Sequence, residues 1–337
     1  MRFPFYQGKG AREERDAPAK LPRSQRSKLL TPENYIADEG LKDACNVALL
    51  LNQPLLLTGE PGTGKTQFAS SLAWELSFQP PLKFETKSNS AARDLFYVYD
   101  ALKRFQDIQS QGGQNRGRST EPLSYLKYQA LGLAILQANP PETVQHLLPD
   151  GFPPFEQQRS VVLIDEIDKA PRDFPNDLLN ELDQMYFRIP ELGNDRVEAD
   201  PDLQPIVIIT SNSEKDLPDA FLRRCIYYHI PFPDHARLSE IVANRLGMHT
   251  GTSSEFLQAA LDLFYQLRKS GLRKKPATAE LLGWLTSLKA ISPNTENPLN
   301  NPDMVHKTLS SLIKTAEDQA KARTVVEKWL QAQTRPT

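Results

Sequence analysis

Short apolar runs separated by helix-like stretches dominate the first two thirds of the chain. Several of these runs lack polar alternation, which is typical of parallel strands buried on both faces of a sheet. Stretches with apolar residues at helical spacing, such as 38–51 and 67–77, lie between them. Strands that alternate with helices predict an α/β fold with a layered, mostly parallel five-stranded sheet. The predicted strands are 54–57, 82–85, 161–164, 206–209 and 226–230.

The pattern changes after Pro233, where no further strand-like run occurs. Apolar residues recur there at helical spacing, and this periodicity predicts a separate, small all-α domain over residues 233–337. The four predicted helices are 234–246, 254–270, 277–290 and 304–333.

Residues 1–33 mix charges, Pro and Gly without apolar periodicity, so we expect an extended arm in front of an α/β domain at 34–232. Residues 1–30 hold 8 basic and 3 acidic side chains, which makes this arm basic. The whole chain has 40 Lys+Arg against 42 Asp+Glu, a net charge of -2. This balance provides no global field that would attract nucleic acid or an anionic membrane.

The expected setting is the cytoplasm. The chain has two cysteines, Cys45 and Cys225, too few for a disulfide framework and consistent with a reducing compartment. No apolar run approaches the ~18 residues of a membrane helix, and the start at Met1 lacks the apolar segment of a secretory signal.

A glycine-rich motif, 59–66 (GEPGTGKT), follows the first predicted strand and opens the next helix. It fits G-x-x-x-x-G-K-[ST], in which glycines let backbone N–H groups surround phosphate oxygens at a helix N-terminus. Lys65 would reach the terminal phosphates, and the Thr66 hydroxyl would ligate Mg²⁺. A chance Gly-rich turn is the alternative, and the flanking strand and helix disfavour it.

Two carboxylates, Asp165 and Glu166, follow the apolar run 161–164. Open α/β sheets bind ligands at the carboxyl ends of their strands, so both should lie beside the phosphates. Asp165 would hold Mg²⁺, and Glu166 would position and deprotonate the attacking water. An acidic turn after a strand is common by itself. Here the turn follows the phosphate motif along the chain, and this order favours the catalytic interpretation.

Together with two later phrases, 209–212 (ITSN) and 220–225 (AFLRRC), these motifs resemble the AAA+ ATPases and, within them, the MoxR-like group. The likeness covers roughly residues 33 to 290. It implies a P-loop αβα sandwich followed by a small helical lid, with ATP and Mg²⁺ bound between them. The ordered set of motifs is specific to AAA+ proteins, whereas the phosphate motif alone is shared by all P-loop proteins.

The resemblance also implies roles for residues outside the two motifs. Asn212 matches the sensor 1 position, where an amide holds water or reports the γ-phosphate; an Asn that caps a strand end is the alternative. Arg223 and Arg224 match the arginine-finger region that reaches a neighbouring subunit's γ-phosphate, and Arg224 is the first choice. A surface pair that closes a helix is the alternative. The expected nucleotide contacts are Gly59, Glu60, Pro61, Gly62, Thr63, Gly64, Lys65, Thr66, Gln67, Tyr35, Ile36, Lys274 and Lys275.

The sequence departs from the family at sensor 2, which usually carries Arg near the start of the lid's third helix. Within the stretch 272–281 no Arg follows Pro276, so Lys274, Lys275 or Arg273 would have to substitute. Arg-to-Lys changes are not neutral at bidentate sites, and a solvated basic turn is an equal alternative.

Two further segments are similar to features of MoxR relatives. Residues 94–137 read as an insert that interrupts the second helix, with a basic Gly-rich loop at 109–120 that touches substrate or is simply solvated. Residues 184–208 suggest a hairpin before the fourth strand. In the resembled group this hairpin faces a central pore.

The favoured function is an oligomeric ATPase that couples ATP hydrolysis to remodelling or maturation of a partner protein. The resemblance implies a hexameric ring that acts on a protein substrate. A protein with a von Willebrand factor A domain is the candidate that it suggests. A nucleic-acid-directed motor, in defence for example, is the first alternative, and the charge balance disfavours it. The second alternative is a nucleotide-gated switch with little turnover, which the missing sensor 2 Arg favours mildly.

Overall fold

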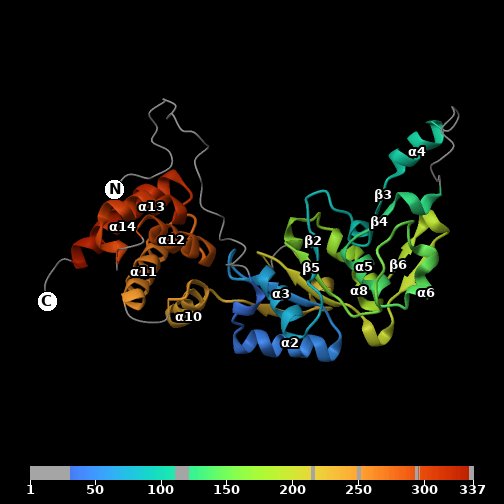
Figure 1. Cartoon of the computed structure of the whole chain (residues 1–337), viewed down its shortest axis with the longest axis horizontal. Coiled ribbons are helices and arrows are strands. Elements are labelled where there is room, and N and C mark those ends of the chain that lie inside the picture. The colour runs from blue at the N-terminus through green and yellow to red at the C-terminus, as the bar shows by residue number, and fades with distance from the viewer. Residues whose placement is uncertain are drawn as a thin grey trace, which may run out of the picture. The chain divides into compact units, whose positions relative to one another are not determined.

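The computed structural model describes residues 31–110, 121–213, 217–248, 252–292, 295 and 297–333. The chain divides into two compact units (Figure 1). The sheet unit is Tyr35–Phe232, and the helical unit is Pro233–Thr337 together with the chain before Tyr35. Most of the predicted N-terminal arm and of the 109–120 loop falls outside the described residues.

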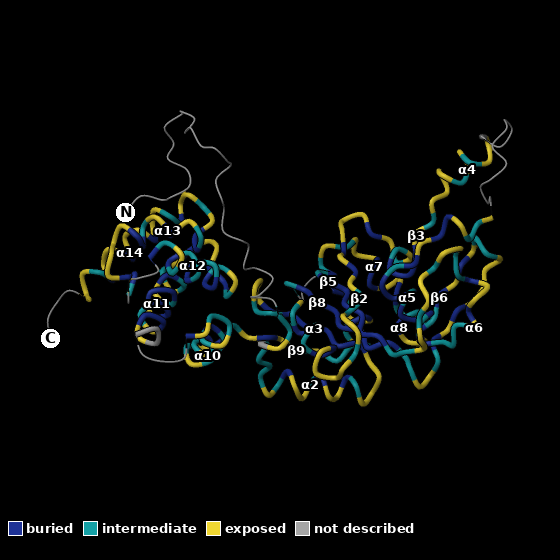
Figure 2. The backbone as a smooth tube through the Cα atoms, in the orientation of Figure 1, coloured by how far each residue is buried: buried dark blue, intermediate teal, exposed yellow. Residues whose placement is uncertain are grey.

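The sheet unit is built on five parallel strands in the order β2-β5-β8-β1-β9. This arrangement confirms the predicted α/β fold with a five-stranded sheet. Strands β1, β5 and β8 occupy the interior of the sheet and are buried along their whole length, as Figure 2 shows for β5 and β8. The strands are β1 (Leu55–Thr58), β2 (Leu82–Glu85), β5 (Val161–Asp165), β8 (Ile206–Thr210) and β9 (Ile226–His229).

Alternate strand residues enter two separate cores because side chains of a strand point to opposite faces. Leu55, Leu163 and Ile208 pack against helices α2 (Glu39–Leu51) and α3 (Lys65–Glu75). Leu56, Ile164 and Ile209 pack instead into the core that contains helix α5 (Ala130–Gln137). The sheet is therefore covered on both faces, which explains why its central strands show no polar alternation.

The segment predicted as an insert in the second helix has regular secondary structure over most of its described residues. It forms an antiparallel pair, β3 (Tyr97–Tyr99) with β4 (Leu126–Tyr128), and helix α4 (Ala101–Ser110) follows β3. The apolar run 131–136 belongs to α5, a continuous helix that packs against β2 and β5. The 3₁₀ turn Ala92–Leu95 precedes this pair, and the Gln129 backbone N–H at the start of α5 donates to the Phe96 backbone oxygen at 2.8 Å. That the segment interrupts a helix stays a prediction.

A second hairpin, β6 (Tyr186–Ile189) with β7 (Asp195–Glu198), precedes β8. Gly193 and Asn194 both have positive φ at its turn, which suits Gly and Asn better than other residues. The remaining short α-helices of the sheet unit are α6 (Pro141–Val144), α7 (Phe174–Asp177), α8 (Leu179–Gln184) and α9 (Asp219–Leu222). Its 3₁₀ turns are Ala92–Leu95, Pro122–Tyr125, Gln145–Leu147, Ile167–Lys169, Pro190–Leu192 and Pro201–Leu203.

The helical unit packs around Trp284, which is fully buried. Its helices are α10 (His235–Leu246), α11 (Thr252–Lys269), α12 (Thr278–Ile291), α13 (Pro302–Leu312) and α14 (Ala316–Gln333), with 3₁₀ turns at Pro32–Asn34 and Pro298–Asn300. None of the described helices is both long and apolar enough to cross a membrane.

The single helix predicted at 304–333 is wrong, because α13 and α14 are separate. Ile313 has extended backbone angles and a fully buried side chain. The Thr315 hydroxyl then accepts a hydrogen bond from the Asp318 backbone N–H at 3.2 Å, the arrangement that starts a new helix. The helical periodicity on both sides of this break concealed it.

Candidate functional site

The 59–66 loop adopts a conformation that only its glycines permit. Gly59, Gly62 and Gly64 all have positive φ, at 142°, 80° and 95°. A Cβ atom on Gly59 would lie 2.5 Å from the backbone oxygen of Ile230, so no larger residue fits there. The loop ends where α3 begins at Lys65, and the helix N-terminus directs its N–H groups and positive potential into the loop.

The Lys65 side chain is buried inside this loop. Its ammonium group donates hydrogen bonds to the backbone oxygens of Gly59 at 2.7 Å and Glu60 at 3.1 Å. Burial lowers the pKa of Lys65, and the nearby carboxylates of Asp168, Asp165 and Glu166 offset part of this effect. The ammonium is therefore held, partly desolvated, at the position where an anionic ligand would gain most from it.

The Asp165 carboxylate joins three elements at the carboxyl edge of the sheet. Its Oδ1 accepts hydrogen bonds from the hydroxyls of Thr66 on α3, at 2.9 Å, and Thr210 on β8, at 2.7 Å. Its Oδ2 lies 3.0 Å from the Lys83 ammonium of β2. Burial alone would raise the pKa of Asp165, but the hydrogen bonds from Thr210, Lys83 and Thr66 hold it below its usual value. The group is therefore an ionised carboxylate at neutral pH.

Thr66 and Asp165 carry oxygen donors of the kind that suits a magnesium ion, and their role as its ligands stays a prediction. A hydroxyl and a carboxylate oxygen lie within hydrogen-bonding distance of each other, next to the phosphate loop. Mg²⁺ prefers such hard oxygen donors, keeps several waters and is completed by substrate phosphates. The two residues would hold the ion, and Thr210 keeps the carboxylate aimed at Thr66.

Glu166 stands immediately beyond β5 with φ 57°, in the left-handed region that few non-glycine residues adopt. Its backbone N–H donates to the Thr210 hydroxyl at 2.9 Å. Its carboxylate forms an ion pair with Lys169 and lies 3.5 Å from the side-chain amide of Asn212. Backbone strain of this kind is often found at functional positions, and the catalytic role of Glu166 stays a prediction.

The backbone N–H of Asn212 donates to the Asp168 carboxylate at 3.0 Å, which fixes the chain just after β8. The structure therefore brings Asn212 and Glu166 together from the ends of two adjacent strands. This proximity is what a sensor residue needs, and the sensor role itself stays a prediction.

Tyr35 lies against the phosphate loop. A Cβ atom on Gly64 would be 3.0 Å from the Tyr35 ring, and the ring packs edge-on against Phe68 of α3 at 6.0 Å between centroids. Ile36 and Gln67, the latter on α3, are both half-buried. Their contacts with a nucleotide base remain predictions.

The two candidate finger residues follow α9. The Arg224 guanidinium donates to the Asp183 carboxylate of α8 at 2.7 Å and to the backbone oxygen of Ala220 at 3.0 Å. Arg223 caps the C-terminus of α9 and is exposed. Arg224 is thus held within its own chain in the structure, and a role toward a neighbouring subunit stays a prediction.

Lys274 and Lys275 belong to the helical unit, whereas the phosphate loop belongs to the sheet unit. The backbone N–H of Lys274 donates to the buried Asp318 carboxylate at 3.0 Å. Both lysine side chains are exposed. Their predicted contacts with nucleotide therefore remain untested.

Sequence reasoning missed three residues that contact the two carboxylates: Lys83, Lys169 and Thr210. Lys83 lies about eighty positions before Asp165, and nothing in its local pattern distinguishes it from a solvated strand lysine. Thr210 could have been noticed as a hydroxyl ending an otherwise apolar strand, beside the already recognised Asn212.

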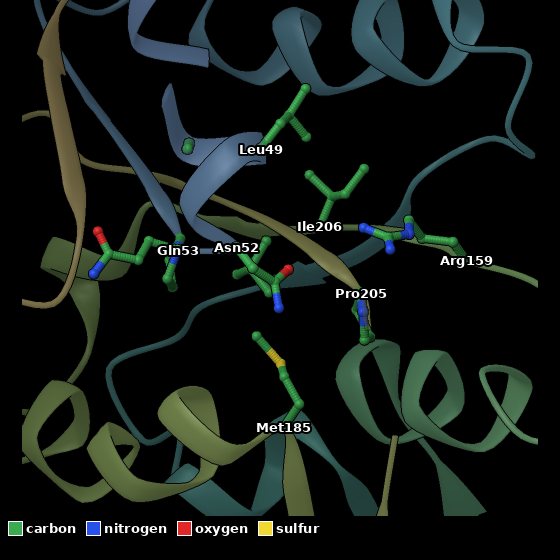
Figure 3. A pocket seen from close by; sticks show the side chains of 10 residues that line it. Leu49, Asn52, Gln53, Arg159, Met185, Pro205 and Ile206 are labelled. Atoms are coloured by element: carbon green, nitrogen blue, oxygen red, sulfur yellow. The ribbon is translucent and has the colours of Figure 1, made fainter. Parts of the chain in front are cut away.

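A small pocket lies at the opposite edge of the sheet, where β1 and β8 begin (Figure 3). Its volume is about 10 Å³, room for one water molecule and far too little for a nucleotide. Leu49, Gln53 and Ile206 are among the residues that line it. The phosphate loop and the strand-end carboxylates therefore remain the candidate site.

The fold and the site together define a P-loop nucleoside-triphosphate-binding protein. Residues 54–225, about half of the chain, match the model of the AAA domain family of the dynein-related subfamily. The chain belongs to this family and therefore carries an AAA-type ATPase domain. A search of curated proteins found no match.

Proposed function

We propose that this chain is an oligomeric, MoxR-like ATPase whose turnover remodels or matures a partner protein. The carrying observation is the cluster at the carboxyl ends of β5 and β8. There, Glu166 lies beside Asn212, and Asp165 lies beside Thr66. A general base next to a water-orienting amide, and a metal-holding pair next to a phosphate loop, are the groups that hydrolysis of a terminal phosphate requires.

In this mechanism the 59–66 loop and Lys65 bind the phosphates of ATP. Thr66 and Asp165 would hold Mg²⁺, which would supply positive charge next to the phosphate oxygens. Glu166 accepts the proton of the attacking water, and Asn212 fixes that water. Since Glu166 forms an ion pair with Lys169, its carboxylate has to turn from the lysine toward the water before it can act.

Arg224 would complete the site from the neighbouring subunit, where a guanidinium stabilises transition-state charge. Heterologous contacts of this kind close into a ring, and the MoxR resemblance implies six subunits. The β6–β7 hairpin and the β3–β4 segment would contact the partner protein, for which a protein with a von Willebrand factor A domain is our first candidate.

The Lys169–Glu166 ion pair also favours a second candidate, a nucleotide-gated switch with little turnover. In that case the base stays paired with Lys169 after ATP binds, and nucleotide occupancy rather than hydrolysis sets the state. The two candidates differ in turnover, so one assay separates them.

The test is the ATPase rate per subunit over a protein concentration series, with Glu166→Gln, Arg224→Ala and Arg223→Ala as variants. We expect the ATPase activity per subunit to rise with protein concentration. Glu166→Gln should still bind ATP but lose activity by about 10²–10⁴-fold. Arg224→Ala should lose about 10³-fold or more, and Arg223→Ala should lose less.

If the rate per subunit does not change with protein concentration or with Arg224→Ala, the active site is not completed by Arg224 of a neighbouring subunit. ATP binding without measurable turnover in the wild type would favour the switch. If Arg223→Ala abolishes the rise of activity with concentration and Arg224→Ala does not, Arg223 is the arginine finger.

A further inference from the structure

Lys83 is placed on the edge strand β2 with its ammonium between two carboxylates. The ammonium nitrogen lies 2.8 Å from Glu85 Oε1 and 3.0 Å from Asp165 Oδ2. Glu85 and Asp165 are partners in the parallel register of β2 and β5, and the long Lys83 side chain reaches along the strand to both. A strand lysine thereby enters the metal-holding end of the site.

The Lys83–Asp165 pair differs from the other ion pair at the site in its burial. The Asp165 side chain is 11% exposed and that of Lys83 is 37% exposed, against 41% and 53% for Glu166 and Lys169. Solvent screens the more exposed pair, and such pairs contribute little. Asp165 is little exposed to water, so the positive charge of Lys83 interacts with its carboxylate with less screening.

Both oxygens of the Asp165 carboxylate have a partner when Lys83 is in place. Oδ1 accepts two hydroxyl donors, from Thr66 and Thr210, and Oδ2 faces the ammonium. A divalent cation that approached this carboxylate would meet both an occupied oxygen and a positive charge a few ångströms away.

We propose that Lys83 is a counter-cation of Asp165 that keeps divalent metal out of the site until nucleotide phosphates arrive. The inference rests on the proposed nucleotide site. Lys83 offsets the negative charge of Asp165, so the carboxylate alone attracts Mg²⁺ weakly. The phosphates of a bound nucleotide add the negative charge that admits the ion. Lys83 also holds Oδ2, which leaves Oδ1 aimed at Thr66, and so it is a positioning residue.

The test compares metal binding by the full-length wild type, Lys83→Met and Lys83→Arg. One arm titrates MgCl₂ at a fixed concentration of a fluorescent ADP analogue and records the half-saturating Mg²⁺. The other arm measures Mn²⁺ binding without nucleotide by electron paramagnetic resonance. Lys42→Met is the matched control, because Lys42 also pairs with a glutamate but lies on the exposed face of α2.

Lys83→Met should lower the half-saturating Mg²⁺ about threefold to tenfold, as expected when one partly screened like charge is removed. It should also bind Mn²⁺ without nucleotide more tightly than the wild type. Lys83→Arg and Lys42→Met should both behave as the wild type. The difference should shrink between 50 and 500 mM KCl, because salt screens the charge that Lys83 supplies.

An unchanged or raised half-saturating Mg²⁺ in Lys83→Met overturns the inference. Far-UV circular dichroism checks its fold, and Lys83→Gln repeats the measurement if Met at this position disturbs β2. If the wild type binds no nucleotide at any Mg²⁺ concentration, the proposed function fails. The nucleotide-free Mn²⁺ arm then still decides the role of Lys83, since equal Mn²⁺ binding by wild type and Lys83→Met would refute it.

Discussion

The sheet unit and the helical unit both bury polar side chains, but they use them differently. In the sheet unit, Lys65, Asp165 and Thr210 are buried together at the carboxyl ends of the strands. In the helical unit, the buried polar groups include Thr308 and Asp318. Thr308 accepts from the indole N–H of Trp284 at 2.9 Å, and Asp318 accepts from the backbone N–H groups of Arg273 and Lys274.

The difference lies in what the polar groups complete. In the helical unit each one closes a structural gap: a buried indole, or two backbone donors before α12. In the sheet unit a desolvated ammonium is enclosed by backbone oxygens, and an ionised carboxylate faces a hydroxyl from another element. Groups arranged in this way cost stability in the empty protein and bind ligand when it arrives. The place of a buried polar residue in the fold, rather than its type, therefore indicates whether its role is structural or functional.

The largest expected effect is on the core of the helical unit. Trp284→Ala should lower the free energy of unfolding by about 3–5 kcal/mol, because it leaves a cavity and removes the partner of Thr308. Urea denaturation followed by circular dichroism measures the change. Trp74→Ala is the control, since Trp74 is 58% exposed on α3 and should cost little. Equal costs for the two would mean that Trp284 is not the centre of a packed core.

Lys65→Met separates function from stability within the sheet unit. Nucleotide affinity should fall at least about 100-fold, or ~2.8 kcal/mol, because a charged phosphate donor is lost. The nucleotide-free protein should be as stable as the wild type or more so, since a partly desolvated ammonium has been removed. Calorimetric titration and thermal melting measure the two quantities. Loss of stability together with affinity would show that Lys65 is mainly structural.

A buried threonine can be replaced by valine in each of the two units. Thr210→Val and Thr308→Val should each cost about 1–3 kcal/mol of stability, because each leaves a buried group without its partner. Thr210→Val should in addition lower ATPase activity, since both Asp165 and the Glu166 backbone lose a hydrogen bond. If Thr308→Val lowers the rate per folded molecule equally, the contrast between the units is wrong.

The smallest expected effect is a change of stability with pH in the helical unit. Hydrogen bonds from the backbone N–H groups of Arg273 and Lys274 lower the pKa of Asp318. Because the folded-state pKa is the lower one, the stabilisation is complete above the unfolded-state value of about 3.9 and is lost as pH falls through the folded-state pKa.

Asp318→Asn should therefore be less stable than the wild type at pH 7, and the gap should narrow toward pH 2.5. Thermal melting at a series of pH values measures this. Glu317→Gln, an exposed carboxylate in the same turn of α14, should stay close to the wild type throughout. If the difference in stability between the two proteins does not change with pH, ionised Asp318 is not the group that stabilises the Arg273 and Lys274 backbone.

The strands were predictable because the buried central strands must be apolar on both faces, whatever their neighbours are. The phosphate loop was predictable because its glycines are required locally, as the contact between Gly59 and the Ile230 backbone illustrates. The break between α13 and α14 was not, because helical spacing continues across Ile313. The place of residues 131–136 was also missed, since an apolar run alone does not say which strands it covers.

Sequence patterns alone account for the α/β fold, the phosphate loop and the two carboxylates that follow an apolar run. These depend on residues that are close together in the chain. The tertiary structure decided that Thr210 joins Asp165 to Glu166, that Lys83 reaches Asp165 from β2, and that Arg224 pairs with Asp183. The reason is physical: the order of parallel strands sets which carboxyl ends are adjacent, and that order arises from packing over the whole sheet and not from any one strand.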